Sequence, residues 1–346
     1  MGKRTGSRKT IYDVAKRAGV SITTVSNVIH DKNNIPDSTK RRIQRVMKSL
    51  DYVPNINAQR LVTARTQIIS LLIPSINNPF FAELYDGIER YLHDKAPRYR
   101  IQIGNTLYSI EREMDLIRTF RREYIDGFII VSNNPSSRGI NELRKNRIPF
   151  VFAINDINKV ADDPLVTYNN YELSYRAATY LLELGHRSFG YIAGLFDESD
   201  RAQARFNGFQ QALRDNSVRF NRSNFVVGGS YSSEAGFLAC RKLCDSRRKM
   251  PTALVCANDL IAVGAKHVLQ KNGLSVPQDV SIIGFDNIQP SAYVFPPLTT
   301  IDVNISELGY ESARLLFQIM DGEKPDNHQV TIEGKLIIRE SCAQVP

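Results

Sequence analysis

The sequence predicts two folds in one chain, a small all-α head and a large α/β body that contains two parallel-sheet subdomains. Three observations predict them. The first 66 residues hold the excess positive charge, their apolar residues recur at helical spacing, and the next 280 residues alternate short apolar runs with amphipathic stretches. A chain of 346 residues is long enough for two or three domains of ordinary size.

Composition narrows the class of protein. The chain is 42% hydrophobic and 23% charged, which is typical of a soluble globular protein. Its mainly apolar runs, such as Ile68–Ile73, are far shorter than the roughly 20 residues that span a bilayer. The basic N-terminus has no apolar stretch behind it, and the four cysteines lack metal-type or paired spacing. We therefore expect a cytoplasmic protein without a secretory signal, a metal, a cofactor or a membrane partner.

The net charge of +9 is unevenly distributed along the chain. Residues 1–66 contain 14 Lys and Arg against 4 Asp and Glu, a balance of +10. The remaining 280 residues contain 31 basic and 32 acidic side chains, a balance of −1. A basic head can be a solubilising tail, a membrane-surface patch or a nucleic-acid footprint, and only the residue pattern chooses among these.

The pattern of the head predicts three short helices. Apolar residues recur at helical spacing from Thr10 to Ala18, and Gly19 ends this helix as a left-handed turn residue. A second helix follows Ser21 as its cap, and a third runs from about Asp37 to Leu50 with a basic outer face.

The first two helices have the spacing of a helix-turn-helix unit. Ala15 is small enough to let the helices approach, Gly19 allows the tight turn, and Val25 packs the second helix on the first. Such a unit places its second helix in the major groove of DNA. The third helix and the charge distribution favour this interpretation over a plain structural module.

The second helix has an inward and an outward face. Three outward side chains are predicted to read bases: Ile22, Thr23 and Asn27. Asparagine suits a bidentate contact to adenine, and threonine and isoleucine suit the thymine methyl group. Three short hydroxyl side chains are predicted to contact phosphates: Ser21, Thr24 and Ser26. The alternative for each hydroxyl is a helix cap or a solvated surface position.

Residues 55–66 form a joint between head and body. Asn55 can cap a helix that is too short to be stable alone in water, so the helix would need a second chain or DNA as a partner. Ala58 and Leu61 are predicted to face the minor groove, where Leu61 would wedge between base pairs and kink the duplex. The alternative is that Leu61 packs on the body.

Residues 10–61 resemble the head of a lactose-repressor (LacI/GalR) family transcription regulator, from TIYDVAKRAGVSITTVSNVI through the hinge segment NINAQRL. The resemblance implies that Ile22 and Thr23 occupy base-reading positions and that Leu61 is the intercalating hinge leucine. Asn27 stands where the family usually has a basic or otherwise polar reader, so the operator preference is left open.

The body alternates strand-like and helical segments, which predicts parallel sheets with helices on both faces. Buried strands are predicted at 68–73, 100–104, 127–131, 148–154, 189–193, 253–257 and 280–284. The helical stretches include 81–92, 110–121, 171–184 and 259–271. About 280 residues favour two such subdomains, with a ligand cleft between them at the C-terminal ends of the strands.

The family resemblance extends over the body, through segments such as NNPFF (77–81), ANDLIAVGA (257–265) and VPQDVSIIGFDN (276–287). It implies a periplasmic-binding-protein-like sensor whose chain crosses between lobes near Asn169, within 297–302 and near Val330. The predicted domains are 1–54 for the helix-turn-helix head, 55–66 for the hinge helix and linker, and 67–346 for effector binding and dimerisation. Lobe 1 comprises about 67–169 and 299–330, and lobe 2 about 170–298 and 331–346.

Five residues are predicted to contact an effector in the cleft: Phe80, Arg205, Tyr231, Asn258 and Asp286. All five match effector positions of the family. In chemical terms, Asp286 can accept two sugar hydroxyls, Arg205 can donate a fork of hydrogen bonds, and the rings can stack on a sugar or base. The alternatives are a structural role for Asp286, helix capping by Asp259, a core position for Phe81 and an exposed position for His186.

One position departs from the family pattern. Many sugar- or purine-binding members have an Asp where Ile154 stands, followed here by Asn155 and Asp156. Either of these polar residues takes over through a one-residue shift, or the ligand is bound differently. Some members that lack this Asp respond mainly to a protein co-regulator, so a protein partner stays an alternative.

Enzyme chemistry is not predicted. The sequence has no G-x-G-x-x-G, G-x-x-x-x-G-K-[ST] or G-x-S-x-G motif, and its five histidines are scattered. We predict a cytoplasmic, nucleoid-associated, homodimeric transcription regulator, more typically a repressor, that binds a pseudo-palindromic operator. Its predicted switch is a small molecule, a carbohydrate or sugar derivative. The alternative is a protein co-regulator with a vestigial cleft.

Overall fold

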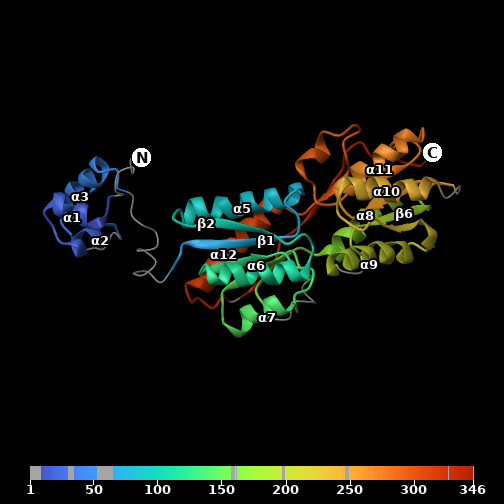
Figure 1. Cartoon of the computed structure of the whole chain (residues 1–346). Coiled ribbons are helices and arrows are strands. Elements are labelled where there is room, and N and C mark those ends of the chain that lie inside the picture. Colours follow the sequence, from blue (N-terminus) through green and yellow to red (C-terminus); the bar gives the residue numbers. More distant parts are fainter. Residues whose placement is uncertain are drawn as a thin grey trace, which may run out of the picture. The chain divides into compact units, whose positions relative to one another are not determined.

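The computed structural model describes residues 9–29, 35–52, 65–156, 160, 162–196, 199–245, 249–325 and 327–345. The chain forms two compact units, residues 1–66 and residues 67–346 (Figure 1), and each is described by itself. Within the described residues, no helix is long and apolar enough to cross a membrane.

The first unit contains α1 (Ile11–Ala18), α2 (Ile22–Ile29) and α3 (Asp37–Ser49), as the sequence predicts. Thr10 precedes α1, and its backbone N–H and its hydroxyl both donate to the Asp13 carboxylate. Gly19 ends α1 at φ 63°, a left-handed conformation that glycine adopts without strain. The apolar faces meet in a small core of buried side chains: Val14, Ala15, Ala18, Val25 and Ile43.

The body begins with a six-stranded parallel sheet in the order β11-β5-β4-β3-β1-β2. Its strands are β1 (Ile68–Ile73), β2 (Arg100–Asn105), β3 (Gly127–Ile130), β4 (Phe150–Ala153), β5 (Leu165–Thr167) and β11 (Gln329–Thr331). The helices around it are α5 (Pro79–Lys95), α6 (Ile110–Arg122), α7 (Arg138–Lys145) and α12 (Ile305–Met320). Leu71 belongs to the core under α5 and α12, whereas Leu72 belongs to the core under α6 and α7, because successive strand residues face opposite sides.

A second parallel sheet has four strands in the order β7-β6-β8-β9. Its strands are β6 (Phe189–Ala193), β7 (Phe225–Val227), β8 (Ala253–Cys256) and β9 (Ser281–Ile283). The helices around it are α8 (Asn170–Glu183), α9 (Asp200–Asp215), α10 (Ser233–Asp245) and α11 (Asp259–Lys271). Its loops include the short 3-10 helices η2 (Arg222–Asn224) and η3 (Gln289–Ala292).

Three described segments connect the two sheets and form a hinge. The chain passes from β5 to α8, returns through β10 (Thr300–Asp302) to α12, and leaves again from β11 to β12 (Lys335–Ile337). β10 and β12 pair antiparallel, and the Ile332 N–H donates to the Thr167 carbonyl. The crossing segments are therefore hydrogen-bonded to one another. Below, lobe 1 is the part that holds the first sheet and lobe 2 the part that holds the second.

Helices α5 and α12 approach to a distance that only glycine allows. A Cβ atom on Gly309 would lie 2.1 Å from the Leu84 carbonyl oxygen, and one on Gly87 would lie 2.0 Å from the Ser306 carbonyl oxygen. Both clashes are with backbone atoms, which cannot rotate away as a side chain can. Glycine makes the same close approach possible between α10 and α11 and between α8 and α9.

Gly309→Ala should destabilise the body by about 1–3 kcal/mol, the usual cost of overpacking a tight core. Helix propensity alone predicts the opposite sign, because alanine favours a helix interior by about 1 kcal/mol over glycine. Urea unfolding followed by circular dichroism measures the change, since the chain contains no Trp for fluorescence. A variant more stable than the natural chain would contradict the conclusion that the backbone of Leu84 leaves no room for a Cβ atom at position 309.

Candidate DNA-reading helix and ligand cleft

The outward face of α2 lies at the surface of the head. Ile22 is 39% exposed, Thr23 is exposed and Asn27 is half-buried, whereas Val25 is fully buried in the head's core. Two of the three side chains that the sequence predicts as base readers, Ile22 and Thr23, are thus exposed, and Asn27 is partly exposed. Exposed side chains on a short helix can reach base edges in a major groove.

Two of the predicted phosphate-contacting hydroxyls form a helix cap. The Ser21 Oγ accepts a hydrogen bond from the Thr24 backbone N–H at 3.1 Å and lies 2.8 Å from the Thr24 Oγ1. Ser21 is therefore the N-cap of α2, the alternative that the sequence left open, and Ser26 is half-buried further along the helix. A capped helix N-terminus still favours anions, so this end of α2 remains suited to a phosphate.

The rest of the head adds positive charge and one aromatic ring. On α3, four basic side chains are exposed: Arg41, Arg42, Arg45 and Lys48. The sequence did not single out Tyr12, which is 68% exposed on α1 and offers a ring and a hydroxyl at the surface. Ala58 and Leu61, predicted to face the minor groove, lie outside the described residues.

A cavity of about 40 Å³ lies between the two lobes of the body. Its walls include all five predicted effector residues, which are Phe80, Arg205, Tyr231, Asn258 and Asp286. Phe81, expected to be a core residue, is buried and also lines this cavity. Side chains from α5, α9 and the loops between strands and helices therefore meet at one place, as expected for the C-terminal ends of parallel strands.

Arg205, in the second turn of α9, is held by contacts on every side. Its Nε donates to the Asn170 amide oxygen at 2.8 Å, and its Nη1 donates to a backbone carbonyl. Its Nη2 donates to the Tyr168 hydroxyl at 2.8 Å and to the Asp286 carboxylate at 3.4 Å. The guanidinium also lies 3.7 Å from the centroid of the Phe285 ring. These contacts fix the plane in which Arg205 can meet a ligand.

Asp286 combines backbone strain with a buried charge. It lies three residues beyond β9 at φ 106°, a conformation that side-chain-bearing residues rarely adopt. Burial raises the pKa of Asp286 to about 7, even though the Arg205 guanidinium opposes the shift. Near neutral pH its carboxyl group can therefore act either as a charged acceptor or as a neutral donor.

The helix that follows β8 is capped by Asn258 and not by Asp259, which corrects the expectation for Asp259. The Asn258 amide oxygen accepts from a backbone N–H of the first turn of α11 at 3.0 Å. Asp259 is fully buried and accepts hydrogen bonds of 2.5 Å from the Ser291 and Thr300 hydroxyls. Burial and the nearby Asp286 carboxylate raise the pKa of Asp259 to about 7. Asp259 thus ties α11 to the β10 crossing.

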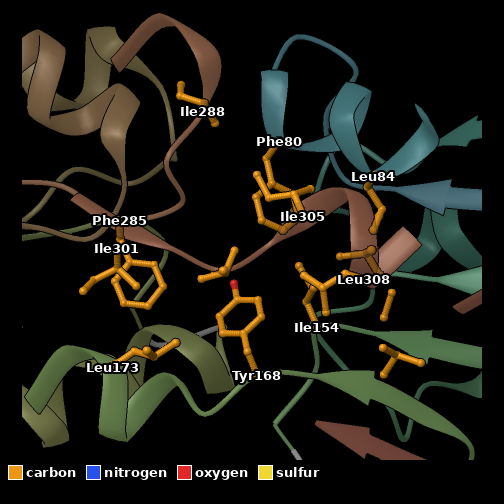
Figure 2. Close-up of a cluster of buried hydrophobic side chains, with 14 of the residues drawn as sticks. Phe80, Leu84, Ile154, Tyr168, Leu173, Phe285, Ile288, Ile301, Ile305 and Leu308 are labelled. Atoms are coloured by element: carbon orange, nitrogen blue, oxygen red, sulfur yellow. The ribbon is translucent and has the colours of Figure 1, made fainter. Parts of the chain in front are cut away.

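Ile154 itself forms part of the cavity wall, at φ 63°. It belongs to the buried cluster that also contains Phe80 and Tyr168 (Figure 2). Asn155 instead donates to the Ser132 carbonyl at 2.7 Å, and neither Asn155 nor Asp156 lines the cavity. The predicted one-residue shift is therefore not seen, and a ligand would meet an apolar side chain at this position.

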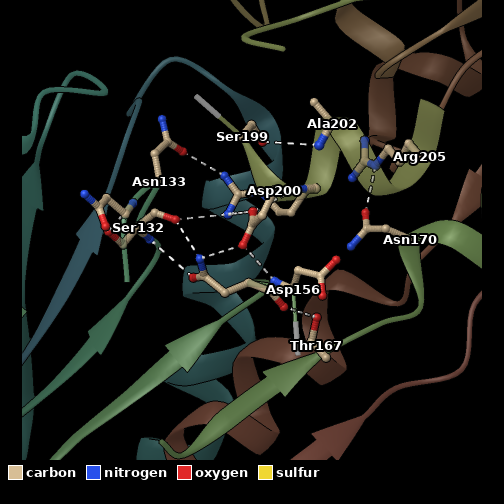
Figure 3. A network of polar contacts seen from close by, with 12 residues as sticks. Ser132, Asn133, Asp156, Thr167, Asn170, Ser199, Asp200, Ala202 and Arg205 are labelled. Atoms are coloured by element: carbon tan, nitrogen blue, oxygen red, sulfur yellow. Dashed lines mark hydrogen bonds and ion pairs between the residues drawn. The ribbon is translucent and has the colours of Figure 1, made fainter. Parts of the chain in front are cut away.

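A polar latch, formed by Asp200 and Arg201 of α9 with their partners in lobe 1, joins the lobes at the cavity, and Arg201 is also one of the residues that line it. The Asp200 carboxylate accepts from the Asp156 N–H at 3.0 Å. Arg201 donates to the Ser132 carbonyl at 3.3 Å and to the Asn133 amide oxygen at 3.0 Å (Figure 3). The sequence did not predict the latch, because an Asp-Arg pair at a helix start is too common to indicate a contact between lobes.

Two further contacts hold the lobes together around the cavity. The Glu83 carboxylate of α5 accepts from the Gln289 N–H of lobe 2 at 3.1 Å. The Tyr108 ring of lobe 1 stacks on the Tyr231 ring of lobe 2, with centroids 6.1 Å apart. The structure is therefore a closed arrangement, in which protein groups occupy most of the cleft.

His186 is buried and not exposed as the sequence suggested. It is 3% exposed, and its ring nitrogens lie 3.0 Å from the Thr252 hydroxyl and 3.1 Å from the Ala343 carbonyl. These contacts fasten the end of the chain to lobe 2, so His186 has a structural role. In the part of the chain that the structure describes, no group of three or more His, Cys, Asp or Glu could hold a metal ion.

Comparisons with known proteins match both units of the chain. Residues 10–55 match the model of bacterial regulatory proteins of the lacI family, and residues 178–342 match the model of a periplasmic binding protein-like domain. Catabolite control protein A of Priestia megaterium is 32% identical over 96% of this chain and 98% of its own length. The HTH-type transcriptional regulator DegA of Bacillus subtilis is 33% identical, over 97% and 98%. A solved complex of the transcriptional regulator CelR with cellobiose superimposes with a TM-score of 0.73 at 26% identity, covering 96% of this chain and 100% of that chain.

The two buried carboxyl groups predict that stability falls as pH rises. Asp259 and Asp286 have pKa values of about 7 in the folded chain and an ordinary value of 3.8. Between these values the folded chain holds protons that the unfolded chain has lost, so the free energy of unfolding decreases with pH. Asp259→Asn, which cannot ionise, should flatten this decrease in urea unfolding curves measured from about pH 4 to pH 7.

The control for this experiment is Asp115→Asn, on the exposed face of α6. It should leave the pH dependence of the free energy of unfolding as in the natural chain. An equal change in both variants, or none in Asp259→Asn, would contradict the role of the buried carboxyl group.

Proposed function

Because the chain belongs to the lacI family of bacterial DNA-binding transcriptional regulators and is not an enzyme, we propose that it is a repressor controlled by a small molecule bound between its lobes. The proposed ligand is a sugar or a sugar derivative. The observation that carries the proposal is the Arg205–Asp286 pair, buried in a cavity with aromatic walls.

The chemistry of the cavity suits a polyhydroxylated ligand. Asp286, Arg205 and Asn258 offer charged and neutral partners for vicinal hydroxyls, and the Phe80 and Tyr231 rings can stack on the apolar face of a sugar. The solved CelR structure contains cellobiose, which supports a carbohydrate for this chain as well. A ligand of this size must separate the lobes beyond the arrangement seen here, because the free volume is about 40 Å³.

On DNA, the proposed regulator acts in the cytoplasm as a homodimer on a pseudo-palindromic operator. Three side chains would read bases in the major groove: Ile22, Thr23 and Asn27. Three hydroxyls would contact phosphates: those of Ser21, Thr24 and Ser26. The basic side chains of the head would add a salt-dependent, sequence-independent affinity for DNA. The hinge residues Ala58 and Leu61 would enter the minor groove at the centre of the site.

The proposed switch is a change in lobe closure. A ligand that alters the Asp200–Arg201 latch shifts lobe 1 relative to lobe 2 and thereby supports or separates the two hinges of a dimer. Coupling of this kind typically amounts to about 1–3 kcal/mol, or roughly 5–150-fold in operator affinity.

Thermal unfolding of the full chain with neutral sugars, sugar phosphates, sugar acids and purines tests the ligand. We expect one of these classes to raise the melting temperature, because a ligand that binds only the folded state stabilises it. Asp286→Asn should remove most of this stabilisation. If no small molecule stabilises the chain and a protein partner does, the small-ligand proposal fails and the co-regulator alternative replaces it.

Selection of operator sequences from random DNA tests the reading helix. Asn27→Ala should relax the preference at one base position per half-site, at a cost of about 1–3 kcal/mol. The control Arg45→Ala, on the exposed face of α3, should instead weaken binding to all sequences alike and lower its salt dependence. A uniform loss with Asn27→Ala would make this residue a phosphate contact.

A further inference from the structure

We propose that lobe 1 carries a second DNA-binding surface, a basic corner that contacts the phosphate backbone of duplex DNA outside the bases read by the head. The basic corner consists of Lys95 at the end of α5, Arg98 in the loop that follows and Arg100 at the start of β2. All three side chains are exposed. The corner belongs to the body, whereas every DNA contact proposed above belongs to the head or the hinge segment.

The basic corner lies where the chain enters the body from the head. The Arg100 N–H donates to the Gln67 carbonyl at 2.9 Å, and Arg100 is the register partner of Ile68 in β1. Residues 53–66 therefore tether this edge of lobe 1 to a head that binds DNA. A tethered surface needs little affinity of its own, because the tether raises its effective concentration at the duplex.

The basic corner and the ligand cleft lie at opposite edges of the lobe 1 sheet. All six strands of this sheet are parallel, and the corner lies where β1 and β2 begin. Three residues of the cleft wall instead directly follow the C-terminal ends of strands: Pro74, Ile154 and Tyr168. A duplex at the corner would thus leave the cleft open to its ligand.

The side chains of the basic corner differ from other basic side chains of lobe 1 in having no carboxylate partner. Arg118 and Arg121 both pair with Glu142, and Arg144 pairs with Asp163. Within the described residues, no ion pair involves a side chain of the corner. An exposed cation without a protein partner is available to replace a counterion on DNA.

The acidic side chains near the basic corner have other partners. The Asp94 carboxylate lies 3.1 Å from a ring nitrogen of His93, and the Glu123 carboxylate accepts from the Gln102 amide at 2.8 Å. Residues 93–100 hold three Lys and Arg against one Asp, a balance of +2, in a body whose total is −1. The local charge therefore complements a polyanion, and the tether to the head makes duplex DNA the polyanion within reach.

The backbone of the corner orients one of its guanidinium groups. The Arg100 Nη1 donates to the Tyr99 carbonyl at 2.8 Å and to the Pro97 carbonyl at 3.2 Å. Its Nη2 has no acceptor among the described residues and can donate to a phosphate oxygen. Contacts of this kind position a protein on the duplex and carry no sequence information.

Fluorescence anisotropy with a labelled random-sequence duplex, over about 50 to 200 mM salt, tests the proposal on the full chain. The corner variant combines Lys95→Gln, Arg98→Gln and Arg100→Gln. We expect its affinity at low salt to fall at least about tenfold, and its plot of log affinity against log salt to be shallower by about 2–3. The base preference of the chain, measured by selection from random DNA, should stay as in the natural chain.

The control variant combines Arg219→Gln, Lys242→Gln and Lys249→Gln, which removes the same charge from exposed positions of lobe 2. Its salt dependence should match that of the natural chain. Equal slopes in the two variants would overturn the proposal, because the effect would then come from net charge alone. A changed base preference in the corner variant, or no binding of random DNA by the natural chain at low salt, would also overturn it. Lys95→Gln with Arg98→Gln, which keeps the Arg100 contacts, serves if the corner variant does not fold.

Discussion

The burial of one guanidinium group, that of Arg205, constrains the whole centre of the body. A charge that is 94% removed from water must be surrounded by acceptors, and the chain supplies them from α8, from the β5–α8 crossing and from the loop after β9. Asp286, at φ 106°, is one of these acceptors, and burial raises the pKa of its carboxyl group although the Arg205 guanidinium opposes that shift.

The helical head and the α/β body were largely predictable because the longer helices and strands show a clear hydrophobic periodicity. The strands predicted at 68–73 and 189–193 coincide with β1 and β6, and the helix predicted at 259–271 coincides with α11. β5, β7, β10, β11 and β12 have three residues each, too few to show a period, and were not predicted, whereas the equally short β9 was predicted within 280–284. These short strands nevertheless complete the sheet edges and the hinge.

The residues that line the cleft were predictable from the sequence, but the closed arrangement of the two lobes was not. Phe80, Arg205, Tyr231, Asn258 and Asp286 were named from strand ends and family positions, and the structure brings all of them to one cavity. The contacts of Asp200 and Arg201 with lobe 1 depend on how far the lobes are rotated, which leaves no mark on local sequence. The same holds for the buried position of His186, which depends on the returning C-terminal segment.

The glycine contacts between α5 and α12 have a consequence for how signals travel. At these glycines the two helices touch through backbone atoms, and no side chain lies between them there that could change rotamer and absorb a displacement. Phe80 stands at the start of α5, and α12 follows directly after the β10 crossing. A displacement of α5 is therefore expected to move α12 with it, and we expect the body to bend mainly at the three segments that connect its lobes.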